Sequence, residues 1–257
     1  ELRARQVRAT IGDALRLDAN GHVDPDTLVG QAGYRLQADF PGLRKQFAAY
    51  VPSAVPPARG RLDVRGDVRQ DSAGTVRLSV RRSELTEIAL LEDVRTGSPA
   101  QPTGSVDVTF QGQARLDGDN LEGNLALAGP AVTGELAFSA DLAGWRNADL
   151  DPGELIAAIV EQRSYSLPAM TLNTDSLRVD GEALARAVPG LQRIADRTQW
   201  RGAKFTFQEV EVRGGPTPGA RGKLEVSDAA VLHAEKRIEP GPVRLSWDAS
   251  ISSQGPR

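Results

Sequence analysis

The sequence predicts a mainly β protein with a few short helices, in which antiparallel strands have one apolar face and one wet face. Three observations support this prediction. Apolar and polar residues alternate with a period of two, as where Leu62, Val64 and Val68 lie between arginines and aspartates. Turn signals separate these stretches, and helical patterns are few and short. A strand buried on both faces would be a continuous apolar run, which these stretches are not.

The alternating stretches recur through most of the chain. Their apolar members, in chain order, are Leu62, Val64 and Val68; Val76, Leu78 and Val80; Val106, Val108, Phe110, Ala114 and Leu116; Leu121, Leu125 and Leu127; Leu136, Phe138 and Ala140; Phe205, Phe207, Val210 and Val212; Leu224 and Val226; and Val243, Leu245, Trp247, Ala249 and Ile251. Gly112 is in phase and predicts a bend or bulge. The phase slips at Gln208-Glu209, which predicts a second bulge.

Glycine, proline and asparagine mark the predicted turns. They fall at Asn20-Gly21, Asp71 to Gly74, Asp117 to Asn120, Gly129-Pro130, Gly214 to Gly219, and Pro240 to Pro242. The stretch "SPAQPT" at 98–103 predicts a loop. No composition shift marks a domain boundary, so we expect residues 1–257 to form a single elongated domain.

Three short helices are predicted. One covers Pro41 to Tyr50. A second begins at Asp151, with Pro152 in the first helical position and Glu154 three residues after the cap. A third starts near Glu182 and ends at Pro189-Gly190.

The helices share an entrance that repeats along the chain. The segment "YRLQADFPGL" (Tyr34 to Leu43) aligns with "LAFSADLAGW" (Leu136 to Trp145), and "LRVDGEALARAVPGL" (Leu177 to Leu191) is a looser third copy. Each unit is a strand that ends in aspartate, then a short helix, then a run of strands. Units therefore start near residues 34, 136 and 177, with uneven spacing.

These units resemble those of the AsmA/TamB-like superfamily of bacterial envelope proteins. In that family a strand ends in an aspartate, an "LAxxLPGL"-type helix follows, and a "GxLxLxGxV"-type strand comes next. The stretches "ADFPGLRKQFAAYVPSAVPPARGRLDVRGDV" and "VDGEALARAVPGLQR", the latter followed by "GAKFTFQEVEV", carry the likeness. The resemblance implies a strongly curved antiparallel sheet with an apolar groove, the internal repeats of a β-groove, and lipid transport in the periplasm.

The resemblance also implies outer-membrane biogenesis or lipid homeostasis, with the full-length protein anchored to the inner membrane. The implied partners are a phospholipid or other acyl lipid, the membrane through an anchor absent from this chain, and an outer-membrane protein. The chain begins at Glu1 and its one methionine is Met170, so we expect a segment of a longer protein.

Composition excludes several classes of function. The net charge is −3 and aromatic residues make up 5% of the chain, which argues against a nucleic-acid partner. There is no cysteine, so disulfides and thiolate metal sites are excluded. No apolar run reaches the roughly 18 residues of a membrane span.

The candidate site is the in-phase apolar set, which would line a lipid groove. Its members are Val64, Val76, Leu78, Val80, Val106, Val108, Phe110, Leu125, Leu127, Leu136, Phe138, Phe205, Phe207, Leu245 and Trp247. Acyl chains would shed water along these positions. We expect aspartate at Val108 or Leu78 to block lipid passage and leave the sheet folded.

Alternatives remain open at the level of sequence. Periodicity alone favours a closed β-sandwich, which would be a structural or adhesive module of the envelope, whereas the resemblance favours the open groove. A carbohydrate-binding sandwich is the third possibility. Its aromatic platform is hard to build from Trp145, Trp200 and Trp247, which are far apart in sequence.

No pattern points to catalysis, so we expect a protein that is not an enzyme and has no metal or cofactor. His22 and His233 are the two histidines, and no G-x-S-x-G elbow is present. "DANGHVDPD" (Asp18 to Asp26) has the oxygens of a Ca²⁺ loop but the wrong spacing, which favours an Asn-Gly hairpin turn.

Charged side chains recur on the polar side of the strands. The carboxylate pairs Glu209 and Glu211, and Asp63 and Asp67, are expected on the wet face, where they keep the protein soluble and protect edge strands. Arg77, Arg81 and Arg82 could contact lipid phosphates, although charged strand faces are usually only solvated.

Overall fold

The computed structural model describes residues 2–48, 57–92, 98–143, 169–191, 202–215, 218–233, 236–239 and 241–250. In chain order its elements are β1 (Leu2–Ile11), β2 (Leu15–Val23), β3 (Gly30–Asp39), α1 (Phe40–Gln46), β4 (Ala58–Gln70), β5 (Val76–Leu90), β6 (Val106–Asp117), β7 (Asn120–Ala128), β8 (Val132–Asp141), β9 (Met170–Asp180), α4 (Gly181–Ala187), β10 (Lys204–Gly214), β11 (Gly219–Ser227), β12 (Val231–His233), β13 (Lys236–Ile238) and β14 (Val243–Ser250).

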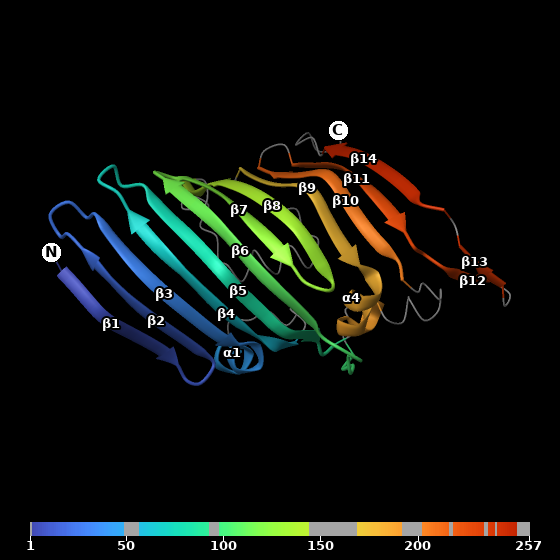
Figure 1. Cartoon of the computed structure of the whole chain (residues 1–257), viewed down its shortest axis with the longest axis horizontal. Helices are drawn as coiled ribbons and strands as arrows, with labels where there is room; N and C mark the ends of the chain where they lie inside the picture. The colour runs from blue at the N-terminus through green and yellow to red at the C-terminus, as the bar shows by residue number, and fades with distance from the viewer. Residues whose placement is uncertain are drawn as a thin grey trace, which may run out of the picture.

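Twelve of these strands form one curved antiparallel sheet (Figure 1). Each strand from β1 to β10 pairs with the next in sequence, and β11 pairs with β14, which forms the far edge. The short strands β12 and β13, which lie between β11 and β14 in sequence, pair with each other as a separate hairpin. The sheet does not close on itself, and within the described ranges no second sheet packs against it. The fold is therefore mainly β with an open curved sheet, and the alternative of a closed sandwich is wrong.

Aspartates at strand ends explain the repeated helix entrance. Asp39 ends β3, and its carboxylate accepts a hydrogen bond of 2.9 Å from the backbone N–H of Gly42 in α1. Asp180 ends β9 and accepts a 2.9 Å bond from the N–H of Ala183 in α4. Asp141, at the end of β8, accepts a 2.9 Å bond from Ala143 N–H. Each of these carboxylates satisfies a backbone donor that has no partner of its own in the first turn.

Five of the six predicted turns and one of the two predicted bulges lie where the sequence places them. The turns after β4, β6, β7, β10 and β13 fall where they were predicted, and β10 has its register shift between Gln208 and Glu211 against β11. The bulge near Gly112 lies in the neighbouring strand, where the pairing of β5 with β6 shifts between Val80 and Ser83.

The predicted turn at Asn20-Gly21 is wrong, because both residues lie inside β2. A Cβ at Gly21 would lie 2.3 Å from the carbonyl oxygen of Gln31, so glycine is needed there for close strand pairing rather than for a turn. The chain turns instead at Asp24, whose carboxylate accepts bonds from the N–H of Asp26 and the hydroxyl of Thr27.

The first and third predicted helices are present as α1 and α4, both shorter than a typical globular helix. The helix predicted to begin at Asp151 lies outside the described residues. The stretch at 98–103 is a loop between β5 and β6, as predicted. No described helix has the length and apolar character needed to span a lipid bilayer.

The buried core of the described residues is small. Its main cluster joins Ala89, Val106, Val108, Ala131 and Ala187 where α4 meets the ends of β5 and β6. Among all described residues, the largest side chain that is less than 2% exposed is that of Ser83. A chain of this length normally buries many large apolar side chains completely. Most apolar side chains of this sheet are only half-buried.

Candidate functional site

The strand register brings the apolar side chains together on one face of the sheet. One row of directly paired residues crosses from β2 to β14 without a polar side chain: Gly21, Ala32, Val68, Leu78, Ala114, Gly123, Phe138, Leu172, Val212, Ala220 and Ala249. Parallel rows run on either side of it. We call this surface the apolar face.

All fifteen sequence-predicted groove residues lie on the apolar face. Val64 is on β4; Val76, Leu78 and Val80 are on β5; Val106, Val108 and Phe110 are on β6; Leu125 and Leu127 are on β7; Leu136 and Phe138 are on β8; Phe205 and Phe207 are on β10; and Leu245 and Trp247 are on β14. Their common orientation follows from the period of two and from bulges that keep the phase across register shifts.

Coverage of the apolar face differs from one end to the other. Val106 and Val108 are only 7% and 9% exposed, because the α4 cluster closes over them. By contrast Leu172 is 38% exposed, Val212 42% and Leu245 56%. The face is therefore closed at the α4 corner and open toward β9, β10 and β14. Val106 and Val108 belong to the packed core, and their substitution would report on folding rather than on a groove.

Sequence reasoning missed part of this face. Strands β1 and β2 and most of β9 were not predicted, and Leu172 was not among the groove residues. Leu15, Leu17 and Ala19 do alternate in β2, so a signal was present. In β9 the alternation breaks at Asp175, opposite Glu209, so Met170 and Leu172 are out of phase with Leu177.

Aromatic rings on the apolar face lie over glycines of the neighbouring strand. Phe138 is paired with Gly123, and a Cβ at that glycine would lie 2.5 Å from the ring. Trp247 lies in the same way over Gly222, and Tyr34 over Gly66. A glycine leaves room for the ring to lie along the sheet instead of standing up from it. These aromatic side chains therefore rise less above the sheet than they would over a larger neighbour.

Among the described residues, Ser83 and Thr174 place buried aliphatic hydroxyls on the apolar face. Ser83 is satisfied, since its Oγ accepts a 3.1 Å bond from the N–H of Arg65 and donates to the carbonyl of Arg81. Thr174, opposite Val210, is 7% exposed, and its Oγ1 has no hydrogen-bond partner within the described part of the chain. Burial of Tyr34, and then the charge of Asp67, raises the pKa of that phenol.

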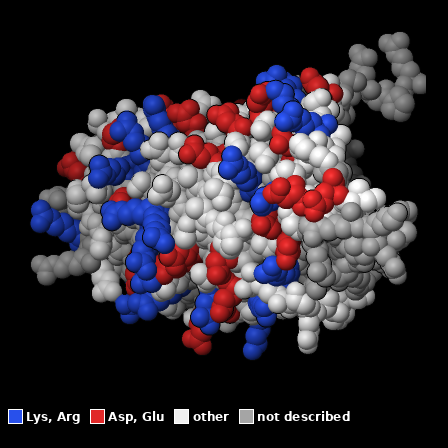
Figure 2. Space-filling view, turned by 45° about the vertical axis from the view of Figure 1, so that its right-hand side comes forward, with Lys and Arg blue, Asp and Glu red and all other residues white. Residues whose placement is uncertain are grey.

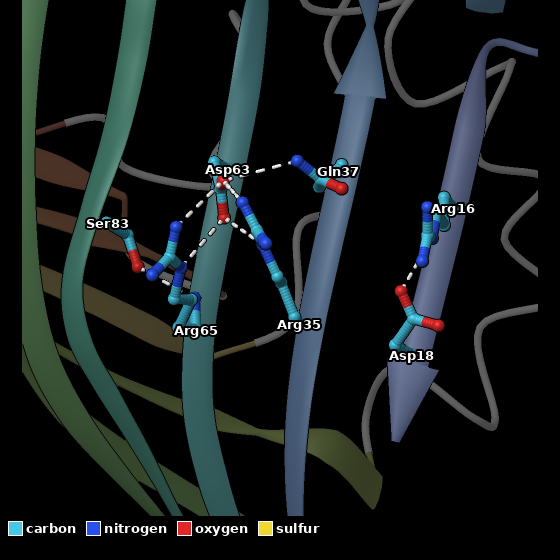
Figure 3. A network of polar contacts seen from close by, with 7 residues as sticks. All are labelled: Arg16, Asp18, Arg35, Gln37, Asp63, Arg65 and Ser83. Atoms are coloured by element: carbon cyan, nitrogen blue, oxygen red, sulfur yellow. Dashed lines mark hydrogen bonds and ion pairs between the residues drawn. The ribbon is translucent and has the colours of Figure 1, made fainter. Parts of the chain in front are cut away.

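The opposite face of the sheet is charged and crossed by ion pairs. Figure 2 shows Lys and Arg side chains next to Asp and Glu over one side of the molecule. The densest network centres on Asp63 of β4, which accepts bonds from Arg35 and Gln37 on β3 and from Arg65 on its own strand (Figure 3). The Arg35 guanidinium, which makes the largest contribution, lowers the pKa of Asp63 to about 2.

The carboxylates that the sequence singled out lie on this charged face and are paired with basic groups. Asp67 accepts two bonds from Arg81, at 2.9 and 2.6 Å. Glu209 accepts from Lys223, and Glu211 lies beside Arg213 and Arg221. Cross-strand pairs of opposite charge stabilise a sheet modestly. They account for these carboxylates without acid–base chemistry.

The histidines, the possible metal ligands and the tryptophans do not form a site within the described residues. His22 lies on β2 and His233 on β12, in different sheets. Within the described ranges no three or more His, Asp or Glu side chains are grouped to hold a metal ion. Trp145 and Trp200 lie outside the described residues.

Comparison of the chain with protein-family models, curated proteins and solved structures gives no match.

Proposed function

We propose that this chain is a non-enzymatic lipid-binding or lipid-conducting segment of a periplasmic envelope protein that is anchored to the inner membrane. Acyl chains would lie on the apolar face, in outer-membrane biogenesis or lipid homeostasis. One observation carries the proposal. The apolar row runs unbroken from β2 to β14, and the apolar face that contains it is left open at Leu172, Val212 and Leu245.

An apolar face that is open on three strands, at Leu172, Val212 and Leu245, is unusual in a protein that has only water as its neighbour. Contiguous apolar surface beyond a few hundred Å² marks an interface or a ligand groove. An acyl chain is the simplest ligand for such a surface, because it needs no hydrogen bonds. Each CH₂ removed from water gains about 0.8 kcal/mol. The low rings over Gly123 and Gly222 leave the face unobstructed along the row.

The two faces of the strands would have different roles. Acyl chains would contact the aliphatic side, while the charged side keeps the exterior in water. Because successive side chains point to opposite faces, one strand supplies both surfaces. In β4, arginine and aspartate alternate with Leu62, Val64 and Val68. The charged residues would keep one face in water, and the aliphatic residues would contact acyl chains on the other.

Neighbouring residues on β14 provide a matched test of this proposal. Leu245 lies on the apolar face and Ser246 on the charged face, and both are exposed. Leu245→Asp and Ser246→Asp add the same charge one residue apart. We expect Leu245→Asp to weaken lipid binding about tenfold or more, since a carboxylate cannot shed water against an acyl chain. Ser246→Asp is expected to bind as the parent does.

The assay is native mass spectrometry of the purified protein, with uptake of a fluorescent phospholipid as the quantitative readout. Leu172→Asp tests the centre of the sheet in the same way. Circular dichroism and the urea midpoint establish that each variant remains folded. A parent protein that carries no lipid and takes up none would contradict the proposal. Equal losses from Leu245→Asp and Ser246→Asp would also contradict it, because the effect would then not belong to one face.

A further inference from the structure

We propose a second binding site, for a phosphorylated sugar, on the charged face of the sheet. A hollow of about 770 Å³ lies there across the strands from β4 to β9. The volume is within the range of small-molecule sites, which run from about 300 to 1,000 Å³. Eleven of its sixteen lining residues are polar and lie in the strand phase of the charged face, and four of the other five, Leu78, Ala114, Gly123 and Phe138, belong to the apolar row. The inference rests on the polar lining residues and makes no use of lipid binding.

Short side chains form the floor of the hollow. Ser79 of β5 and Ala137 and Ser139 of β8 lie between longer neighbours on the same face. The hydroxyls of Ser139 and Thr171 are hydrogen-bonded to each other at 2.6 Å, which ties β8 to β9 at this point. Where the side chains are short, the surface between the longer ones is lowered.

A row of carboxamides crosses the floor. Gln113 on β6 is directly opposite Asn124 on β7, and Asn173 on β9 follows one strand beyond Ala137 in the same row. Each carboxamide has two donors and an acceptor. None of the three makes a side-chain hydrogen bond to another described residue, so all are available to a ligand. Hydroxyl groups of a sugar both donate and accept, and they match such a row.

Three arginines on adjacent strands form one wall of the hollow. Arg69, Arg77 and Arg115 are directly paired across β4, β5 and β6. Like charges placed directly opposite destabilise a sheet. Arg77 is 3.7 Å from Asp71, and Arg115 bonds Asp117 at 2.7 Å, both near the turns. Arg69 has no acidic partner in the described part of the chain, and Arg69 and Arg77 are thus the least compensated pair.

An anionic group bridging Arg69 and Arg77 would relieve this repulsion. Guanidinium groups bind phosphate through paired charge-assisted hydrogen bonds. The nearby carboxylate of Asp67 does not compete, since Arg81 already holds it through two bonds. Glu122, opposite Arg115, makes the far end of the row unfavourable for an anion. Phosphate at Arg69 and Arg77 with sugar hydroxyls on the carboxamides fits both halves of the hollow.

The test is a titration of the whole chain with glucose 6-phosphate, followed by the side-chain amide signals in ¹H–¹⁵N NMR spectra. We expect the signals of Gln113, Asn124 and Asn173 to move in a saturable way. The double variant Arg69→Gln with Arg77→Gln should weaken binding about tenfold or more, as the loss of charge-assisted bonds requires. Arg244→Gln is the matched control, because Arg244 lies on the same face on β14 and bonds Glu225.

Parallel titrations with glucose and with inorganic phosphate complete the test. Weaker binding of each than of glucose 6-phosphate supports the site. Phosphate binding as tightly as glucose 6-phosphate would overturn it, because the carboxamides would then recognise nothing. Unmoved amide signals, or an equal loss in Arg244→Gln, would overturn it as well. Leu245→Asp should leave this titration unchanged, which separates its outcome from that of the lipid assay.

Discussion

Replacing Val108 and Val212 by alanine, one at a time, measures how unevenly the apolar face is covered. The substitution is chemically the same, and both residues lie on inner strands of the sheet, so the loss of β-propensity largely cancels. Val108 is 9% exposed and lies in the α4 cluster, whereas Val212 is 42% exposed.

The expected magnitudes follow from these exposures. Removing two methyl groups forfeits about 1.6 kcal/mol of transfer free energy when the side chain is fully buried. At Val108 nearly all of this is lost, and a residual cavity adds about 1 kcal/mol, for a total of about 2.5 kcal/mol. At Val212 roughly 0.9 kcal/mol is lost and no cavity forms, because solvent fills the space.

Urea unfolding monitored by circular dichroism checks these values, with the slope of the transition compared to that of the parent. We expect Val108→Ala to lower the free energy of unfolding at least twice as much as Val212→Ala. Equal losses would refute the reasoning, because Val212 would then be covered as fully as Val108. In that case the open part of the apolar face would not exist.

Three further predictions concern how the sheet is held together. Asp63→Asn should cost about 1 kcal/mol at neutral pH, an amount reduced by solvent around the partly exposed ion pairs. Because the pKa of Asp63 is lowered from 3.8 to about 2 by Arg35, its contribution is full above pH 4 and is lost as the pH falls toward 2; the difference in urea midpoint between parent and Asp63→Asn should vanish over that range. Gly123→Ala should cost about 1–3 kcal/mol because its Cβ would lie 2.5 Å from the Phe138 ring and 2.6 Å from the backbone carbonyl oxygen of Gln113; Phe138→Leu in the same chain should recover only the part of the midpoint that the ring accounts for, and the absence of any recovery would assign the whole loss to the backbone of Gln113 and contradict a role for the ring. Asp180→Ala removes the cap of α4 and should cost about 1 kcal/mol; Asp180→Asn retains an acceptor and should restore the thermal midpoint, unless the charge rather than the hydrogen bond matters.

Much of the fold can be predicted from the sequence because its signals are local. The alternation in β6 to β8 places Phe110, Leu127 and Phe138 on one face without knowledge of any partner strand. The aspartate that ends a strand and begins a helix is equally local, since Asp39 and Asp180 bond the backbone three residues on. Turn chemistry located the connections after β4, β6, β7, β10 and β13 for the same reason.

Signals that need a neighbouring strand were less predictable. Gly21 looks like a turn residue beside Asn20, and only the close approach of Gln31 in β3 explains it. Leu172 was missed because the alternation of apolar residues breaks within β9. The matching break that keeps Leu172 on the apolar face lies in β10, which follows a long stretch of chain. The hollow on the charged face depends on which polar residues share a row across β4 to β9, and strand register sets those rows.

Alternation in the sequence is enough to predict that the strands have one apolar and one charged face, because a period of two orients side chains whatever the strands pair with. Whether the apolar face is covered does not follow from this alternation and depends on the tertiary fold. Val108 and Leu245 have the same alternating context in sequence, yet one is buried under α4 and the other is more than half exposed. Coverage depends on which distant segment packs against a face, and that is a property of long-range contacts rather than of local periodicity.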